Sequence, residues 1–205
     1  MCYNKKAAEI AGVFRGGRNM SFVAVILAEG FEEIEALTVV NLLRRAQVDV
    51  RTVSLTSDKM VVGSRNITVC ADITLQEIGK DDLEMLVMPG GIVCRDNMSA
   101  SIPLKKLVLE LNEENSRIAA ICAAPSVLGR WGVLEGVKAL SYPDKSIEME
   151  LKGRIIPGEN LRTITDKNIT TSSGPATAME FGLELIKILK GQKVANQVAE
   201  GLLYK

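Results

Sequence analysis

Hydrophobic residues in this chain form short continuous runs that alternate with amphipathic stretches of helical period. Such runs are typical of strands buried on both faces of a parallel sheet. The pattern predicts an α/β fold: a flavodoxin-like three-layer sandwich with a mostly parallel central sheet and helices on both faces. The expected strands are 22–28, 48–55, 67–69, 84–88, 118–121, 137–140 and 169–172, and the expected helices are 33–46, 102–114, 124–131, 176–190 and 194–202.

The first residues differ in character from the rest of the chain. Residues 1–19 end in the basic, turn-rich sequence Arg15-Gly16-Gly17-Arg18-Asn19. We expect 1–19 to be a disordered N-terminal extension, with a targeting or partner-binding arm as the alternative. Residues 20–205 are then expected to form a single domain, because one α/β core suits that length.

Charge and composition limit the classes of molecule that the protein is expected to bind. The chain carries 25 basic and 25 acidic side chains, so no net field would attract a nucleic acid or an anionic membrane. No apolar run approaches the length of a membrane span. The cysteines, Cys2, Cys70, Cys94 and Cys122, show no paired spacing, which favours a reducing compartment. We therefore expect a cytoplasmic protein that binds neither nucleic acid nor membrane.

The chain contains no histidine. This composition excludes a Cys-His dyad, a Ser-His-Asp triad and histidine-ligated zinc, and with them a triad-type peptidase. The sequence also has no nucleotide-binding glycine motif. We expect neither a metal ion nor an organic cofactor.

Cys122 lies where the expected strand 118–121 meets a helix. At such an elbow the unpaired N–H groups and the dipole of the helix favour the thiolate and lower the pKa of a cysteine. Pro125 suits the first turn of that helix because a proline needs no N–H partner there. The alternative is a buried, unreactive thiol, since free cysteines are among the most buried residues.

Two further strand ends carry candidate chemistry, and parallel sheets form their sites at such ends. Pro89-Gly90-Gly91 follows the strand 84–88, and a glycine pair there can point its N–H groups inward as an oxyanion hole or simply form a tight turn. Glu32, Glu33 and Glu35 open the first helix, where capping is the simple interpretation. One of them could instead face the thiol and exchange a proton with it, and the spacing does not say which.

Motifs spread from Met20 to the C-terminus resemble, in order, those of the ThiJ/PfpI superfamily. The resemblance is strongest to the branch that contains the parkinsonism-associated protein deglycase and its bacterial relatives. Each motif alone is modest, whereas the ordered set is specific. The matching segments are Leu27–Ala36, Leu43–Ala46, Ser64–Arg65, Met88–Gly91, Ala119–Pro125 and Ser172–Thr177.

The resemblance implies roles for individual residues. Cys122 would be the nucleophile, and Glu35 would be the carboxyl group hydrogen-bonded to it. Burial beside a thiolate would raise the pKa of Glu35 above its ordinary value. The amides of Gly91 and Ala123 would form an oxyanion pocket. Two glycines would shape this pocket, Gly90 and Gly174.

The resemblance also implies a homodimer, in which Arg65 reaches the partner's site and Arg45 lies near the edge of the site. The apolar breadth of the first helix supports a dimer through that helix. The chain departs from the family pattern at two positions. Ala123 stands where the protease-like branch has a histidine, and Tyr142 stands where many deglycase-like members have another.

These features together predict a cofactor-independent cysteine enzyme, a glyoxalase- or deglycase-like hydrolase or lyase. Its small-molecule carbonyl substrate would be a 2-oxoaldehyde such as methylglyoxal, or an early glycation adduct of one, with Cys122 as nucleophile and Glu35 as proton shuttle. The alternative is an oxidative-stress redox sensor or chaperone whose Cys122 is oxidised to a sulfinate. Thiazole monophosphate biosynthesis is a third function attributed to members of the superfamily. The sequence does not support it, because it contains no phosphate-binding loop.

Overall fold

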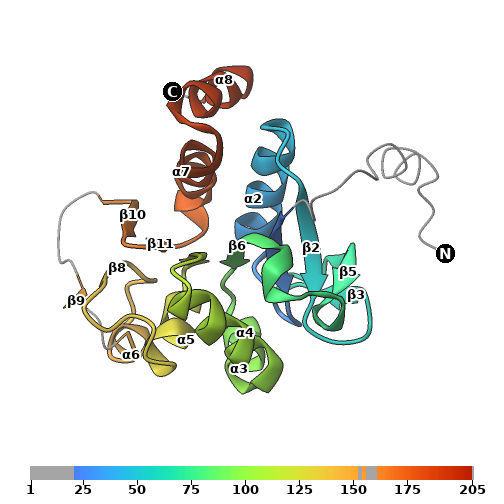
Figure 1. Ribbon diagram of the computed structural model, residues 1–205, viewed down its shortest axis with the longest axis vertical. Coiled ribbons are helices and arrows are strands. Elements are labelled where there is room, and N and C mark those ends of the chain that lie inside the picture. Colours follow the sequence, from blue (N-terminus) through green and yellow to red (C-terminus); the bar gives the residue numbers. More distant parts are fainter. Residues whose placement is uncertain (1–20, 152–153, 156–160, 205) are drawn as a thin grey trace.

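The computed structural model describes residues 21–151, 154–155 and 161–204. The extension expected at 1–19 therefore lies outside the described residues. The helices and strands form three layers, with a sheet between two layers of helices (Figure 1). The predicted three-layer α/β sandwich is confirmed.

The central sheet has seven strands in the order β10-β11-β7-β6-β1-β2-β5. Neighbouring strands are parallel except at one edge, where β10 pairs antiparallel with β11. The mostly parallel sheet is thus as predicted. Its strands are β1 (Phe22–Leu27), β2 (Val50–Ser54), β5 (Ile73–Thr74), β6 (Leu83–Met88), β7 (Arg117–Ile121), β10 (Thr163–Asp166) and β11 (Ile169–Ser172).

Two small sheets lie outside the central one. The antiparallel hairpin of β3 (Met60–Val62) and β4 (Thr68–Cys70) contains the strand expected at 67–69. The pair of β8 (Lys138–Ala139) and β9 (Arg154–Ile155) takes up part of the strand expected at 137–140. Short apolar runs alone do not tell which sheet a strand joins.

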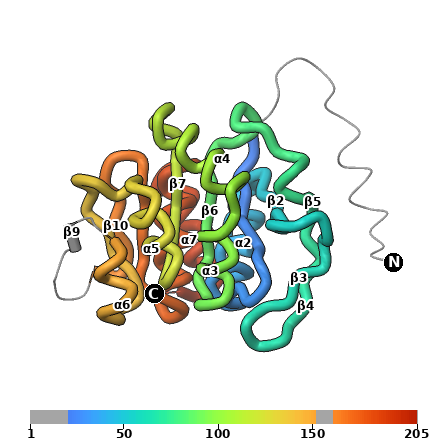
Figure 2. Tube along the Cα trace, turned by 90° about the horizontal axis from the view of Figure 1, so that it is seen from below, coloured from blue at the N-terminus to red at the C-terminus, as the bar shows by residue number. Residues whose placement is uncertain are grey.

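Helices cover both faces of the central sheet, as Figure 1 and the perpendicular view in Figure 2 show. Within the described ranges, no helix is both long and apolar enough to cross a membrane. One face carries α2 (Glu33–Arg45), α7 (Ala178–Lys190) and α8 (Gln192–Gly201), and the other carries α3 (Ile92–Ala100), α4 (Ile102–Glu113), α5 (Ala124–Arg130) and α6 (Lys145–Glu148). Three short 3-10 turns connect elements: Leu75–Glu77, Lys80–Asp82 and Pro175–Thr177.

The core has two halves because both faces of the sheet are buried. Along β1, Phe22, Ala24 and Ile26 pack into one half, with side chains of α3, α4 and α5. Val23 and Val25 point into the other half, with side chains of α2 and α7. This alternation explains why a fully apolar strand is required at this position.

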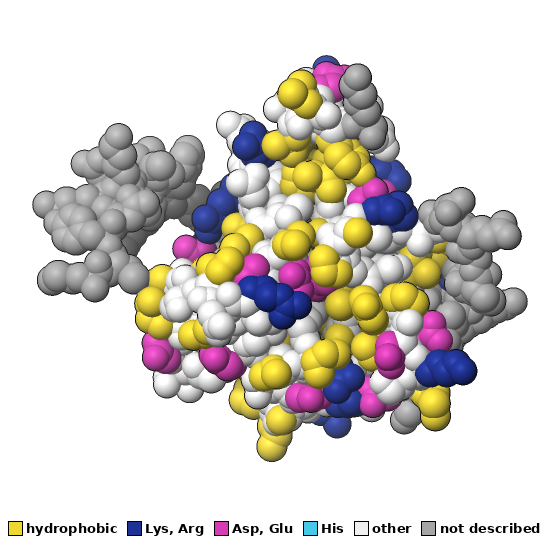
Figure 3. All heavy atoms as spheres, turned by 180° about the vertical axis from the view of Figure 1, so that it is seen from behind, with side chains coloured by type: hydrophobic (Ala, Val, Ile, Leu, Met, Phe, Trp, Pro, Cys, Tyr) yellow, Lys and Arg dark blue, Asp and Glu magenta, His cyan; other side chains and the backbone are white. Residues whose placement is uncertain are grey.

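The outer surface mixes charge signs. On the face shown in Figure 3, acidic and basic side chains are interspersed, several of them next to one another, with hydrophobic side chains around them. Among the described residues on this face, the basic side chains form no continuous patch of the kind that follows a nucleic-acid backbone.

The strand order decides where loops can meet. β1, β6 and β7 are neighbours and run parallel, so the segments that follow them emerge at one edge of the sheet. These segments carry the acidic start of α2, the glycine pair and Cys122. The fold therefore brings together three motifs that are far apart in the sequence.

A core substitution tests this packing. Phe181 on α7 is fully buried in the half of the core that contains Val23 and Val25. Phe181→Ala should lower the free energy of unfolding by about 3–5 kcal/mol, because it leaves a cavity against the sheet. Leu203→Ala, at a side chain that is 88% exposed, should change it by less than about 0.5 kcal/mol. Urea unfolding monitored by circular dichroism measures both, and equal midpoints would contradict this packing.

Candidate active site

Cys122 occupies a strained elbow between β7 and α5. Its φ is +64°, a left-handed conformation that few residues other than glycine adopt. Hydrogen bonds on both sides hold this conformation: the Cys122 N–H donates to the Ser172 carbonyl at 3.0 Å, and the Cys122 carbonyl accepts from the Tyr142 N–H at 2.8 Å. The turn points the thiol away from the strand and into the site.

Glu35 lies in the first turn of α2 and is fully buried. Its Oε2 accepts the Gly90 N–H at 2.7 Å, while Oε1 has no donor in good hydrogen-bond geometry. The Cys122 thiol is the side chain that interacts with this carboxyl group. A buried carboxyl group with an unoccupied oxygen beside a thiol is able to exchange a proton with it.

Burial raises the pKa of Glu35 to about 7, although the interaction with the Cys122 thiol and the Gly90 N–H oppose this shift. The direction agrees with the sequence prediction for Glu35. A carboxyl group with a pKa near neutrality both takes up and releases a proton at physiological pH. Glu35 therefore has the acidity expected of a proton shuttle.

Burial also raises the pKa of the Cys122 thiol, and the neighbouring Glu35 carboxylate raises it further. The amides of Ala123 and Gly91 oppose this shift by donating to the sulfur. The direction is opposite to the one that the elbow position predicts. The reason is that burial and the acidic neighbour from α2 raise the pKa more than the backbone N–H groups at the elbow lower it.

The two acids are coupled. Transfer of the thiol proton to Glu35 leaves the net charge of the pair unchanged and turns the carboxylate from an acceptor into a donor towards the thiolate. The two amides at the sulfur then stabilise the charge that has moved there. A thiolate can therefore form by a proton shift within the site, without an external base.

Gly90 allows the two acids to meet. A Cβ at this position would lie 2.5 Å from Glu35 Oε2 and 2.6 Å from Cys122 Cβ, so any side chain would separate them. Gly91 has a φ of +99°, and a Cβ there would lie 2.2 Å from the Gly30 carbonyl oxygen. The glycine pair is therefore required by close packing at the site.

A pocket of about 520 Å³ opens above the Cys122 thiol. One part of its lining is apolar and comes from Ile92, Val93, Tyr142, Ile147 and Pro175. The other part is backbone and polar side chains from Gly30, Glu32, Ser64, Arg65 and Gly91. Such a mixed lining suits a small organic molecule with a polar reacting end.

Glu32 and Glu33 have separate tasks. Glu32 caps α2, accepting the Glu35 N–H at 2.8 Å, in agreement with the capping interpretation. Glu33 is buried and accepts from the Arg65 N–H at 2.6 Å and from the Ser64 hydroxyl at 3.0 Å. Burial alone would raise the pKa of Glu33, but these hydrogen bonds lower it below its ordinary value. Glu33 thus holds the turn that brings Ser64 and Arg65 to the pocket, a role that the sequence did not indicate.

The structure places most of the predicted site residues around this pocket. Gly174 lies beside the Tyr142 ring, where a Cβ would be 3.4 Å from the ring. Arg45 is the exception. It ends α2, about 15 Å along the helix from Glu35, and its Nε donates to Asn41. Arg45 does not line the pocket within one chain, and its cross-subunit placement stays a prediction.

No cluster of three or more histidine, cysteine, aspartate or glutamate side chains suited to a metal ion occurs among the described residues. Cys94, on α3, is fully buried, and burial raises the pKa of its thiol to about 12. This thiol is fully buried and does not line the pocket, so it lacks the access that a reactive cysteine needs.

Comparison with known proteins gives consistent matches. The profile of the DJ-1/PfpI family matches residues 21–188. The chain is 35% identical over 179 residues to protein dj-1beta of Drosophila melanogaster, which covers 87% of this chain and 95% of the fly protein. It is 33% identical over 182 residues to the Parkinson disease protein 7 homolog of Danio rerio, covering 88% and 96% of the two chains.

Solved structures agree with the sequence matches. The crystal structure of Drosophila melanogaster DJ-1beta superimposes with a TM-score of 0.82 at 35% identity, covering 91% of this chain and 100% of that one. The structure of oxidized Toxoplasma gondii DJ-1 gives a TM-score of 0.81 at 33% identity, covering 90% and 98%. The architecture described above is thus similar to that of these proteins along nearly the whole chain.

The raised pKa of Glu35 predicts a pH dependence of stability. As the pH rises from about 4.5 to about 7, the unfolded chain releases this proton before the folded protein does. The contribution of Glu35 is therefore complete below about pH 4.5 and is lost as the pH rises through about 7, by on the order of 3 kcal/mol. Urea unfolding at a series of pH values, for the wild type and Glu35→Gln, isolates this contribution. Parallel curves for the two proteins would contradict the burial of an ionisable Glu35.

Proposed function

The chain belongs to the DJ-1/PfpI family, and on that premise we propose that it is a cofactor-independent cysteine enzyme with glyoxalase- or deglycase-like activity. Its substrates would be 2-oxoaldehydes such as methylglyoxal, or their early adducts with amines and thiols. One observation carries the proposal: a buried carboxyl group with a pKa of about 7 lies against the thiol of Cys122.

The first step is addition of sulfur to the aldehyde. Glu35 takes the proton from Cys122, and the thiolate attacks the aldehyde carbon to form a hemithioacetal. The negative charge moves to the former carbonyl oxygen, which the amides of Gly91 and Ala123 are positioned to stabilise because they already donate to the sulfur. Protonation of this oxygen by Glu35 completes the addition.

The second step is an internal redox reaction. Glu35 removes the proton from the carbon bonded to sulfur and returns it to the adjacent ketone carbon, while the hydroxyl proton of the hemithioacetal passes to the ketone oxygen through an enediol. One carbon is thereby oxidised as its neighbour is reduced. The product is a thioester of a 2-hydroxyacid on Cys122. Water cleaves the carbon–sulfur bond, releasing the hydroxyacid and restoring the thiol. For methylglyoxal the product is lactate, and no external oxidant is needed.

This chemistry does not depend on a histidine. The chain has none, so the proton transfers fall to Glu35, the buried acid whose pKa of about 7 suits them. Tyr142 occupies the wall of the pocket near the position of the histidine found in many deglycase-like proteins, and its N–H holds the Cys122 carbonyl at 2.8 Å. These contacts support catalysis by a Cys-Glu pair.

A second function, that of a redox sensor or stress-response chaperone, has its own support. Oxidation of Cys122 by peroxide to a sulfinate would place new oxygens where the Gly91 and Ala123 amides and a protonated Glu35 can donate to them. The similar Toxoplasma gondii structure is of an oxidized form of that protein. Catalytic turnover distinguishes the two functions, because oxidation of a sensor is a single event.

The proposed enzyme would act in the cytoplasm as a homodimer. Half-exposed hydrophobic side chains lie on the two elements that meet near Arg65: Ile34 on α2, and Met60 and Ile67 on the β3–β4 hairpin. Glu33 links that hairpin to α2, so the two elements are held next to each other. Hydrophobic groups gathered on a surface of this kind favour a protein partner, and a second copy of the chain fits the family.

Turnover assays test the proposed activity. The wild type should produce lactate from methylglyoxal, and Cys122→Ser should not. Glu35→Gln keeps a hydrogen-bond donor but cannot exchange a proton, so kcat should fall by roughly 10²–10⁴-fold. Glu114→Gln serves as the control, because Glu114 pairs with Lys80 outside the pocket and should leave turnover within severalfold of the wild type. Equal activity of the Glu35→Gln variant and the wild type would overturn the assignment of the proton shuttle.

Light scattering tests the homodimer. The wild type should have the mass of two chains at micromolar concentration. Ile34→Lys places a charge at a side chain that is 55% exposed in the single chain and should shift the protein towards the monomer. Leu203→Lys, at a more exposed side chain far along the sequence, should not. A monomeric wild type would remove Arg65 from any role in the partner's site.

A further inference from the structure

One wall of the Cys122 pocket comes from a segment that has little regular structure. Tyr142 and Ile147 line the pocket, and both belong to residues 140–151, whose only helix is the four-residue α6. Two hydrogen bonds fix the start of the segment: the Leu140 N–H donates to Thr171 Oγ1 at 2.8 Å, and the Tyr142 N–H donates to the Cys122 carbonyl at 2.8 Å. The position of its other end depends on different contacts.

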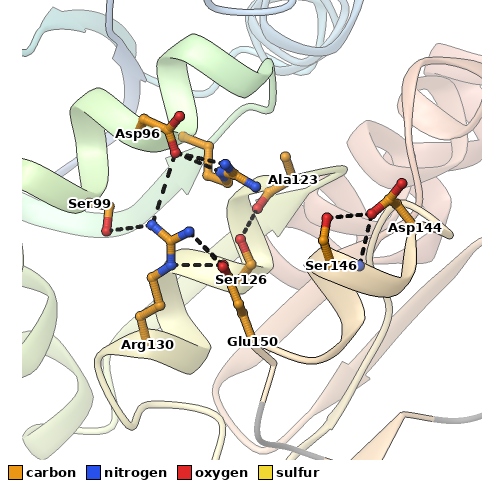
Figure 4. Close-up of polar contacts among 9 residues, drawn as sticks. Asp96, Ser99, Ala123, Ser126, Arg130, Asp144, Ser146 and Glu150 are labelled. Atoms are coloured by element: carbon orange, nitrogen blue, oxygen red, sulfur yellow. Dashed lines mark hydrogen bonds and ion pairs between the residues drawn. The ribbon is translucent and has the colours of Figure 1, made fainter.

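That end is held by a bidentate ion pair between Arg130 on α5 and Glu150. Arg130 Nε and Nη2 each donate to one oxygen of Glu150 at 2.7 Å, and both side chains are 31% exposed (Figure 4). The third nitrogen of the guanidinium group, Nη1, donates to the Ser99 hydroxyl on α3 at 3.0 Å. Paired, charge-assisted hydrogen bonds of this geometry fix orientation better than a single contact does.

The backbone of Glu150 and Leu151 packs directly against Gly129 of α5. A Cβ at Gly129 would lie 2.2 Å from the Glu150 carbonyl oxygen and 2.5 Å from that of Leu151. The end of the segment therefore rests directly on α5. Ile147 and Leu151 are buried on either side of Glu150, so a shift of Glu150 would move the pocket wall with it.

The ion pair joins three elements that each deliver a part of the pocket. α3 starts after Gly91, α5 starts after Cys122 and Ala123, and the segment held by Glu150 carries Tyr142 and Ile147. Arg130 belongs to α5, and its guanidinium group contacts the other two elements. Figure 4 shows this group lying between Asp96 and Ser99 on one side and Glu150 on the other.

We propose that Arg130 is a positioning residue that sets the width of the Cys122 pocket by holding the 140–151 wall against α5 and α3. It thereby sets the size of the carbonyl compound that reaches the thiol. The inference rests on the proposed function only in taking this pocket as the substrate site. Arg130 itself does not line the pocket.

Alkylation of Cys122 by a small and a large reagent tests the proposal without requiring turnover. Iodoacetamide is the small reagent and N-phenylmaleimide is the large one, and mass spectrometry of the peptides reports each thiol separately. Arg130→Met should raise the ratio of large-reagent to small-reagent rates at Cys122 roughly three- to tenfold, the range expected when a bidentate ion pair no longer holds the wall. Arg44→Met is the matched control, because it removes an arginine that pairs with Asp72 outside the pocket.

Cys94 provides an internal control for loss of folding. It is fully buried on α3, so general destabilisation would raise its labelling together with that of Cys122. The proposal expects Cys94 to stay protected in the Arg130→Met protein. The charge-exchanged double variant Arg130→Glu/Glu150→Arg should return the ratio towards the wild-type value. Arg130→Lys, which keeps the charge but loses the paired geometry, should give an intermediate ratio.

An unchanged ratio in Arg130→Met would overturn the proposal, as would equal increases at Cys94 and Cys122. If Arg130→Met does not fold, Arg130→Lys decides by the same ratio. The outcome is separable from that of the proposed function: absence of methylglyoxal turnover in the wild type refutes the enzyme but leaves the size selectivity measurable. If turnover is present, the KM for a bulky 2-oxoaldehyde such as phenylglyoxal should change in Arg130→Met more than kcat does.

Discussion

The site depends on the close approach of two buried acids. Glu35 and the Cys122 thiol share a space that water does not reach freely, so neither ionises easily alone. The approach is possible only because position 90 has no side chain. In this low dielectric the pair carries at most one negative charge, and the backbone amides of Gly91 and Ala123 stabilise that charge when it lies on the sulfur. The surrounding structure keeps these groups at fixed distances.

The secondary structure of the central layers was largely predictable because burial on both faces leaves a strong pattern. β1, β6 and β7 are short, largely apolar runs, and their parallel pairing follows from the helices between them. α3 was missed because it buries only Cys94 and Met98 and exposes Ile92 and Val93, so its sequence has no clear apolar stripe. β10 was missed because its sequence is mostly polar and it occupies a sheet edge.

The site was predictable in its parts and less so in its electrostatics. Sequence motifs indicated Cys122, Glu35 and the glycine pair, and the sheet brings them together. The direction of the Cys122 pKa shift was not predictable from the elbow alone, because it depends on burial and on a carboxyl group from another element. Glu33 was also misjudged, since its partners Ser64 and Arg65 lie about thirty residues further along the chain. Ion pairs such as that of Arg130 and Glu150 leave no local signal for the same reason.

The left-handed backbone at Cys122 has a consequence for the evolution of this fold. A residue with a side chain in that conformation costs roughly 1–3 kcal/mol, which is a large share of the net stability of a typical domain. The surrounding hydrogen bonds to Ser172 and Tyr142 must offset that cost in every functional descendant. Selection for the reactive thiol therefore acts on the whole elbow. Substitutions selected for stability alone would remove the left-handed conformation at Cys122 and, with it, the orientation of the thiol that the chemistry requires.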